Sequence, residues 1–113
     1  MQRGDIVEVQ FYFPSQNFTQ NHMAIVLSVP EVWDVEETFV CVPISSKEEY
    51  DCDYTLPIDP TNIDGQYKIF GGIRLHLITA ISKRQLLGPT RLRVRNLFLN
   101  QIYKRINSLV FGI

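Results

Sequence analysis

The sequence predicts a mainly β protein of the α+β kind, a small and strongly bent barrel of five to seven short strands with a helix at its C-terminal end. Two observations carry this prediction. Short apolar runs rich in β-branched residues recur along most of the chain, with turn-forming residues between them. One stretch with the helical spacing of apolar residues follows them. A chain of 113 residues suits one core, so residues 1–113 are expected to form a single domain.

The most informative predicted strand is Phe39–Ser46, with the sequence FVCVPISS. Its first four residues are apolar, as in a strand that is buried on both faces. Pro43 lacks a backbone hydrogen-bond donor, so the ladder is expected to stop there or to lie at an edge. The hydroxyls of Ser45 and Ser46 follow, and a rigid strand that ends in small polar groups is a natural place for a site. A turn capped by these serines is the plainer alternative.

The other elements follow from alternation, apolar runs and turn residues. The remaining strands are expected at residues 6–13, 23–29, 54–58, 67–70, 73–81 and 87–92. Residues 30–37 are expected to form a connecting loop, from which Trp33 folds back over the barrel. Residues 82–86 are expected to form a short helical turn. The helix is predicted at Arg93–Leu109, where apolar residues recur at helical spacing.

Composition and targeting signals indicate a soluble, cytoplasmic protein. The chain is 45% hydrophobic and 20% charged, which is ordinary for a globular domain. It contains no apolar run near the roughly 20 residues that cross a bilayer, and its first residues lack the apolar core of a signal peptide. Cys41 is expected to fill the core, whereas Cys52 lies in an acidic loop. The two cysteines and two histidines form no zinc signature, so no metal or cofactor is expected.

Charge is distributed unevenly along the chain. Residues 1–64 hold all twelve acids and only two of the eleven bases, so residues 65–113 hold nine bases and no acid. If the two halves mix in space, they neutralise each other across the fold. If they segregate, the basic half offers a surface for a polyanion such as RNA or DNA. The sequence leaves both arrangements open.

Four stretches in order resemble the MazF/PemK (Kid) family of bacterial toxins. The first is Gly4–Val9, GDIVEV, which is similar to the opening strand of the family. The second is His22–Ser28, HMAIVLS, beside the family pattern RPAVVLS. The third is Val40–Ser46, VCVPISS, beside V-x-P-I-T-S. The fourth is Ile78–Leu86, ITAISKRQL, beside IRTISK-x-RL, and these last two stretches are the more specific ones.

The resemblance implies both a fold and a function. The fold of the family is a small SH3-like barrel of the CcdB/MazF type with a terminal helix. Its members are homodimeric toxins that are paired with a cognate antitoxin protein, and they cut single-stranded RNA such as mRNA without a metal or cofactor. The ribose 2′-hydroxyl attacks its own phosphate, which requires a base, an acid and donors or cations for the charge that develops.

This sequence departs from the family pattern at the positions that carry the chemistry. The arginine of the second strand falls on Met23, or on His22 if the register shifts by one, and the arginine of the fourth stretch falls on Thr79. The turn hydroxyl survives as Ser45 or Ser46. The candidate catalytic residues are His22, Ser45, Ser46, Arg74 and His76. The candidate RNA-binding residues are Thr79, Lys83, Arg84, Arg91, Arg93 and Arg95.

Two functional hypotheses from different classes follow. In the first, the chain is an endoribonuclease toxin in which His22 acts as base or acid, while Arg74 and His76 stabilise charge. In the second, it is a toxin-like binding module that holds a protein or nucleic acid without cutting it. Methionine donates no hydrogen bond, and losing such a donor costs about 2.7–4 kcal/mol of transition-state stabilisation, which favours the second hypothesis. Poisoning of DNA gyrase by the same fold is a third hypothesis, for which no residue argues.

Overall fold

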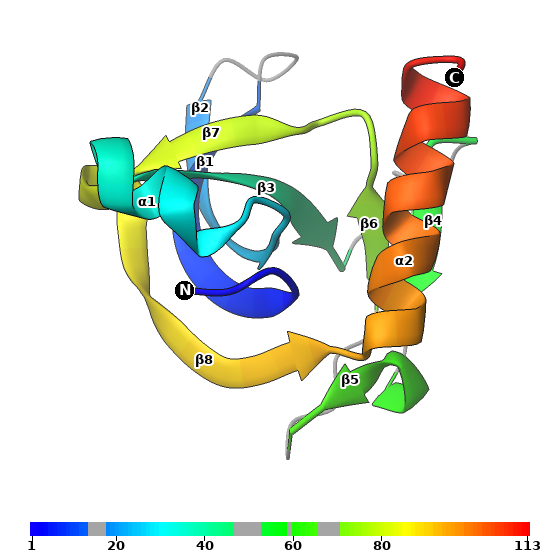
Figure 1. Ribbon diagram of the computed structural model, residues 1–113, viewed down its shortest axis with the longest axis horizontal. Helices are drawn as coiled ribbons and strands as arrows, with labels where there is room; N and C mark the ends of the chain where they lie inside the picture. The colour runs from blue at the N-terminus through cyan, green and yellow to red at the C-terminus, as the bar shows by residue number, and fades with distance from the viewer. Residues whose placement is uncertain (14–17, 47–52, 59, 66–70) are drawn as a thin grey trace.

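The computed structural model describes residues 1–13, 18–46, 53–58, 60–65 and 71–113 (Figure 1). The strands in these ranges are β1 (Asp5–Phe13), β2 (Phe18–Val26), β3 (Thr38–Ser45), β4 (Thr55–Ile58), β5 (Ile63–Asp64), β6 (Gly71–Arg74), β7 (Thr79–Ser82) and β8 (Leu86–Val94). The helices are α1 (Pro30–Glu36), α2 (Asn96–Arg105) and its π-helical continuation η4 (Ile106–Val110), and the 3₁₀ turns are η2 (Pro60–Asn62) and η3 (Lys83–Gln85).

The strands form one antiparallel sheet that curls into a barrel-like shape. The order along the sheet is β4-β6-β3-β2-β1-β8-β5, and β7 pairs with the first half of β3. The chain runs from β7 through η3 into β8, which pairs with β1 on the far side (Figure 1). This connection joins the β3 side of the sheet to the β8 side and so contributes to the curled shape. Helix α2 covers the outer side of the curved sheet near β4 and β6.

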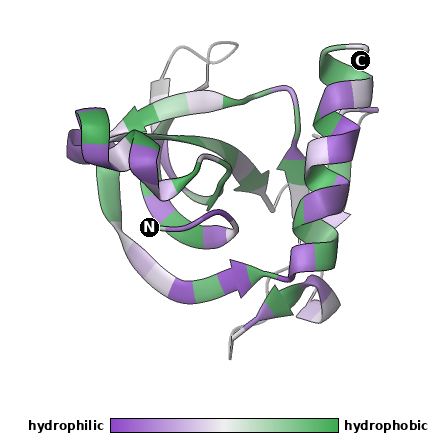
Figure 2. Cartoon of the chain, in the orientation of Figure 1, coloured by the Kyte–Doolittle hydropathy of each residue, from purple (hydrophilic) through white to green (hydrophobic). Residues whose placement is uncertain are grey.

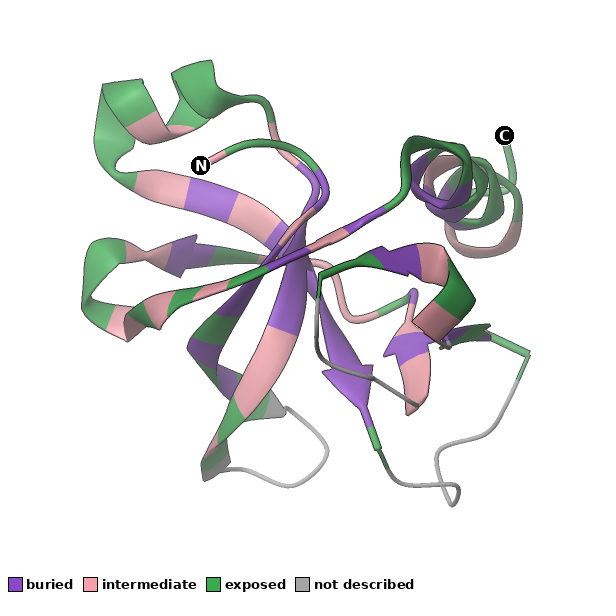
Figure 3. Cartoon of the chain, turned by 90° about the horizontal axis from the view of Figure 1, so that it is seen from below, coloured by how far each residue is buried: buried purple, intermediate pink, exposed green. Residues whose placement is uncertain are grey.

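Side-chain alternation divides the buried residues between two clusters. The inner core lies within the curl of the sheet and consists of Val7, Val9, Phe11, Ala24, Val26, Phe39, Cys41 and Ile81. The helix core lies between the sheet and α2 and includes Ile25, Val42, Ile44, Ile73, Leu92, Phe98, Leu99 and Ile102. The buried side of α2 faces the sheet (Figure 3), and apolar and polar residues alternate along its ribbon (Figure 2). Because successive side chains of a strand point to opposite faces, the strands contribute residues to both cores.

The structure confirms the mainly β fold with a C-terminal helix, and two details of the prediction are wrong. Eight strands occur in the described ranges rather than five to seven, because the predicted strand 73–81 is interrupted between β6 and β7 and because the short strand β5 was not predicted. The N–H of Leu77 donates to the carbonyl of Arg74 at 3.1 Å, so the chain turns where a continuous ladder was expected. The predicted strand 67–70 lies outside the described residues.

The predicted loop at residues 30–37 is the helix α1. Pro30 occupies its first turn, where a missing N–H costs nothing, and Glu37 ends it in a left-handed conformation with φ of 53°. Trp33 packs on the inner core, and its ring centroid lies 6.0 Å from that of Phe39. The expectation that Trp33 folds back over the barrel therefore holds, although a helix rather than a loop carries it.

Burial also determines the chemistry of one cysteine. Cys41 is fully buried in β3, and burial raises the pKa of its thiol to about 12. It is therefore an inert core residue, as the sequence predicts, while Cys52 lies outside the described residues. Within the part of the chain that the structure describes, no helix is long and apolar enough to cross a membrane.

Candidate active site

Three of the candidate catalytic residues lie on one face of three neighbouring strands. On β3, Ser45 has the same parity as Phe39 and Cys41, whose side chains enter the inner core. On β2, His22 has the parity of Ala24 and Val26, which enter the same core. Because the strands are hydrogen-bonded neighbours, the register carries this face from β2 to β3.

The same face continues from β3 onto β6. Ser45 pairs with Gly72, and Ile73, the next residue, points into the helix core with its partner Ile44. Arg74 follows Ile73 and therefore lies on the face of Ser45. Neighbouring strands are about 4.8 Å apart, so the face that carries His22, Ser45 and Arg74 spans about 10 Å across β2, β3 and β6. We call these three residues the strand-end face.

The structure separates the two residues that compete for the position of the second-strand arginine. Met23 pairs with Ile44 and packs against the helix core. His22, one residue earlier, points to the opposite side of the sheet, toward the strand-end face. Only His22 of these two residues shares a face with Ser45. The sequence alone leaves the choice open, because a shift of one residue reverses the face of a strand side chain.

Hydrogen bonds orient the His22 ring. Its Nδ1 lies 3.0 Å from the carbonyl of Ile44 and donates to it, because a carbonyl only accepts. Its Nε2 lies 3.1 Å from Oε1 of Gln20. Contacts at both ring nitrogens therefore fix the orientation of the ring, with Nδ1 committed to the backbone of β3.

The two serines at the end of β3 differ in exposure. Ser45 is buried, with 2% of its surface exposed, whereas the next residue, Ser46, is exposed. A Cβ at Gly71, which has φ of 149°, would lie 2.4 Å from the carbonyl oxygen of Ser45. Glycine at that position allows β6 to approach the end of β3 closely. Ser45 thus lies on the sheet face of His22 but is buried. Ser46 is exposed, so a ligand can reach its hydroxyl without movement of the strand.

Arg74 and His76 lie together, and the structure adds Tyr54 to them. Nη2 of Arg74 lies 3.5 Å from Nε2 of His76. The His76 ring is tilted on Tyr54 with centroids 5.4 Å apart, and Tyr54 is 43% exposed. The sequence gives no sign of Tyr54 as a site residue, because the tyrosine precedes β4 and meets His76 only through the pairing of β4 with β6. The carbonyl of Tyr54 accepts from the N–H of Leu75 at 2.9 Å, which ties the two segments together.

Arg74 also affects the charge state of His76. Partial burial of the ring is the larger cause that lowers the pKa of His76, and the positive charge of Arg74 is the second. Arginine has donors only, so Nε2 of His76 is the acceptor in this 3.5 Å contact. The lowered pKa makes the uncharged form of His76 more favourable than in a free histidine, and its role in stabilising charge together with Arg74 stays a prediction. Uncharged His76 can also orient the guanidinium.

The candidate RNA-binding residues lie on β7, η3, β8 and the start of α2. Thr79 pairs with Cys41 in the middle of β3, so it shares the sheet face of Ser45, which lies four residues further along β3. Three cations are paired with acids from the front half of the chain, at 3.6 Å for Lys83–Glu37, 3.6 Å for Arg93–Asp5 and 3.5 Å for Arg95–Asp64. The acidic and basic halves therefore mix and partly neutralise each other. Arg84 and Arg91 are exposed.

The residues that the structure describes contain no group of three His, Cys, Asp or Glu side chains that could hold a metal ion. The site so defined is a strand-end face on a small curled sheet, with a histidine, a hydroxyl and a guanidinium. Side chains of these kinds can transfer protons and stabilise developing negative charge.

Residues 2–110 match the family described as the PemK-like, MazF-like toxin of type II toxin–antitoxin systems. The chain belongs to this family of toxins, and the resemblance found in its sequence is confirmed. No curated protein sequence matches the chain.

Solved structures share the fold at low sequence identity. A crystal structure of MazF from Deinococcus radiodurans is similar with a TM-score of 0.78 and 13% identity, over 98% of this chain and 96% of that one. An endoribonuclease in complex with its cognate antitoxin, from a mycobacterial species, has a TM-score of 0.72 and 12% identity over 98% and 95%. A MazE–MazF complex from Deinococcus radiodurans has 0.72 and 14% over 97% and 94%.

Proposed function

We propose that this chain is the endoribonuclease toxin of a toxin–antitoxin pair and that it cuts single-stranded RNA without a metal. One observation carries the proposal: His22, Ser45 and Arg74 share one face of β2, β3 and β6. This face combines a proton-exchanging ring, a hydroxyl and a cation. Cleavage of RNA by its own 2′-hydroxyl requires these kinds of group.

The proposed reaction is an internal transfer of the phosphoryl group. A base removes the proton of the 2′-hydroxyl, and the 2′ oxygen forms a bond to phosphorus. The bond from phosphorus to the 5′ oxygen then breaks, and an acid gives this leaving oxygen a proton. The products are a 2′,3′-cyclic phosphate and a 5′-hydroxyl. Since one proton is taken up and one is returned, the reaction needs no other reactant.

Each residue of the strand-end face has a proposed role, and so do three residues outside it, Ser46, Tyr54 and His76. Nε2 of His22 carries out one of the two proton transfers, because Nδ1 is committed to the carbonyl of Ile44. Arg74 stabilises the negative charge on the phosphorane, and neutral His76 orients its guanidinium. Ser46 binds the phosphate through its exposed hydroxyl, and Ser45 supports the strand end. Tyr54 offers an exposed ring on which a base can stack.

A binding module without catalysis is the second candidate. The observation that favours it is the loss of the arginines of the family at Met23 and Thr79, because Met23 packs against the helix core and cannot contact a phosphate from there. Such a module would hold RNA or a protein and leave it intact. Both candidates share the family and the fold, so activity has to decide between them.

Incubation of the purified chain with a long single-stranded RNA in EDTA tests the proposal. We expect cuts that leave 2′,3′-cyclic phosphate ends, because water takes no part in the first step. His22→Gln and Arg74→Gln should slow the cutting about 10²-fold or more, and Ser46→Ala should weaken it. The matched control is Asn21→Ala, since Asn21 is exposed on the next position of the same strand but points to the other face.

One result would contradict the nuclease, and another would contradict its site. RNA that is retarded on a gel but never cut, at any protein concentration, would establish the binding module. Cutting that persists unchanged in both His22→Gln and Arg74→Gln would remove the strand-end face from the chemistry.

We also propose an antitoxin partner and a homodimer. The similar structures include a MazE–MazF complex and an endoribonuclease with its cognate antitoxin, which supports a partner of this kind. Exposed apolar side chains such as Leu97, 87% exposed on α2, and Leu87, 45% exposed on β8, support contact with further protein. Sedimentation of the chain alone, and with the product of a small acidic reading frame beside its gene, tests both.

A further inference from the structure

Strand β4 extends the face of Arg74 by one further strand. β4 lies beyond β6 at one end of the sheet (Figure 1), and Thr55 pairs with Arg74 across the ladder. Leu56 and Ile58 of β4 enter the helix core. Thr55 has the opposite parity and therefore lies on the face of Arg74. Because neighbouring strands are about 4.8 Å apart, Thr55 lies next to Arg74 and roughly 14 Å along the sheet from β2.

The absence of a side chain at Gly72 makes room for the side chain of Thr55. A Cβ at Gly72 would lie 2.3 Å from Cγ2 of Thr55, so the methyl group of Thr55 fills the space above this glycine. Gly72 pairs with Ser45 on its other side. Thr55 therefore leans from its partner Arg74 toward the row of Ser45. Because a β-branched side chain has few rotamers, this contact also fixes where the Thr55 hydroxyl lies.

The residues of β4 offer groups that suit a nucleotide. Tyr54, which precedes the strand, is exposed, Thr55 is half-buried and Pro57 is exposed. Pro57 has the parity of Thr55, so both lie on the same face. A threonine hydroxyl can donate a hydrogen bond to a phosphate oxygen, and an exposed aromatic ring can stack on a base. The end strand of the sheet thus carries a donor and a ring side by side.

The contacts of Arg74 separate this area from the site of proton transfer. Nη2 of Arg74 lies 3.5 Å from Nε2 of His76, so the guanidinium extends along β6 toward His76 rather than over Gly72. His22 lies on the side of Arg74 away from Thr55, because the strands follow in the order β4, β6, β3 and β2. An RNA strand that crosses the sheet with its scissile phosphate between His22 and Arg74 would place its next phosphate over β4.

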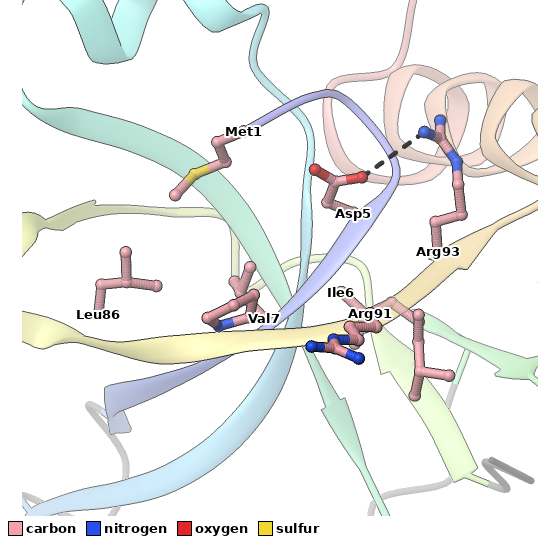
Figure 4. Close-up of a pocket in the computed structure, with 9 residues that line it drawn as sticks. Met1, Asp5, Ile6, Val7, Leu86, Arg91 and Arg93 are labelled. Carbon is pink, nitrogen blue, oxygen red and sulfur yellow. Dashed lines mark ion pairs between the residues drawn. The ribbon is translucent and has the colours of Figure 1, made fainter. Parts of the chain in front are cut away.

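The cavity between β1 and β8 lacks these features. It lies where the ladder shifts at a bulge that contains Thr90 and Arg91, and Arg91 adopts a left-handed conformation with φ of 64°. Its volume is about 420 Å³, and none of its described lining residues is aromatic. At its rim Arg93 is already paired with Asp5, as Figure 4 shows. Of these two places, β4 therefore suits a single-stranded nucleic acid better.

We propose that β4 binds the phosphate next to the scissile one along the RNA, with the hydroxyl of Thr55 as its hydrogen-bond donor. The base beside this phosphate stacks on Tyr54. The inference rests on the proposed function, because it takes His22 and Arg74 as the place of the cut. Thr55 takes no part in the proton transfers. It determines how well the site uses an RNA that is longer than the dinucleotide at the cut.

Cleavage of a longer and a shorter substrate by the full chain tests the subsite. The cut is first mapped in a long single-stranded RNA in EDTA. The two probes are then a heptanucleotide centred on the cut and the dinucleotide that contains only the scissile phosphate. Thr55→Val removes the hydroxyl but keeps the branched shape over Gly72. We expect kcat/KM for the heptanucleotide to fall about fivefold, as for the loss of one neutral hydrogen bond, and kcat/KM for the dinucleotide to stay within about twofold.

Two further variants separate the hydroxyl from the packing of the strand. Thr55→Ser keeps the hydroxyl and should retain kcat/KM for both probes within about twofold. Thr38→Val removes a half-buried hydroxyl at the start of β3, on the face opposite to Ser45, and should also leave both values unchanged. An equal loss for the two probes in Thr55→Val, or no loss for the heptanucleotide, would overturn the subsite and leave the nuclease in place.

Binding of an RNA that cannot be cut separates this inference from the proposed function. A short fluorescent 2′-O-methyl RNA lacks the attacking hydroxyls, so its affinity depends on contacts alone. If the wild-type chain cuts no RNA but binds this probe, and Thr55→Val weakens the binding about fivefold, the nuclease proposal fails and the phosphate contact stands. If Thr55→Val binds the probe as tightly as the wild-type chain, or if neither binds it, the phosphate contact fails.

Discussion

The two sides of the curled sheet present their polar groups in different ways. On the β3 side the register advances one residue at a time, from Met23↔Ile44 to Val26↔Cys41, and Ser45 pairs with Gly72 without a shift. On the β8 side the register shifts twice within five residues of β1. The first side gathers His22, Ser45 and Arg74 by simple alternation. The second opens a cavity and directs Arg91 to it through a strained bulge.

The difference shows where the direction of a side chain can be predicted from the alternation of residues along a strand. In a regular ladder the direction of every side chain follows from one known neighbour, so the strand-end face follows once the core residues of β2, β3 and β6 are known. A bulge inserts residues and breaks this relation, so the direction of a side chain after it depends on local hydrogen bonds. Thr90 provides these bonds on β8.

The largest expected effect comes from removing the cation of the regular side. Arg74→Met should lower kcat by about 10²–10³, as the loss of one donor to a developing charge does. The physical reason is that the phosphorane charge would lose its guanidinium partner. The rate of cleavage of a labelled RNA in EDTA measures it. Arg105→Met, which removes an exposed guanidinium from α2, should retain the wild-type rate.

The next effect contrasts two glycines, one from each side of the sheet. Gly71→Ala should lower the free energy of unfolding by roughly 3 kcal/mol, because the new Cβ would meet the carbonyl oxygen of Ser45 and φ is positive. Gly88→Ala on β8 should change it little, because nothing lies within 4 Å of its Cβ position. Urea unfolding measures both, and equal losses would show that β6 does not approach β3 as closely as described.

A smaller effect is expected from the bulge. Thr90→Val should cost roughly 1.5 kcal/mol of unfolding free energy, because the N–H of Leu92 and the carbonyl of Ile6 lose a side-chain partner. Thr90→Ser keeps the hydroxyl and should recover most of this loss. Thermal unfolding followed by circular dichroism measures the difference. Equal destabilisation by the two substitutions would mean that shape, rather than hydrogen bonding, holds the bulge.

The smallest expected effect concerns the protonation of His76. Burial and the charge of Arg74 hold the pKa of His76 below its usual value of 6.5. Arg74→Gln removes the second cause only, so an NMR titration should move the pKa of His76 upward but leave it below 6.5. Because the folded state binds the proton less readily than the unfolded chain, the contribution of His76 to stability is present above pH 6.5. It decreases as the pH falls below 6.5 toward the pKa of the folded state. An unchanged pKa would contradict the contact of Arg74 with His76.

Much of the fold could be predicted from local pattern. The run FVCVPIS specifies β3 because continuous apolar residues with β-branching suit a strand buried on both faces. The helical spacing of Phe98, Ile102 and Ile106 specifies α2 and η4, whose buried side carries these residues. The helix α1 replaces the loop expected at residues 30–37, and Pro30 is well suited to the first turn of this helix.

The sequence by itself determined most of the strands, the terminal helix and the residue types of the candidate site, because these depend on neighbours in the chain. Only the tertiary structure decided that His22 rather than Met23 shares a face with Ser45, that Tyr54 joins Arg74 and His76, and that acids from the front half pair with Arg93 and Arg95. The physical reason is register. A shift of one residue between strands reverses every side chain, and only the pairing of distant segments selects one register.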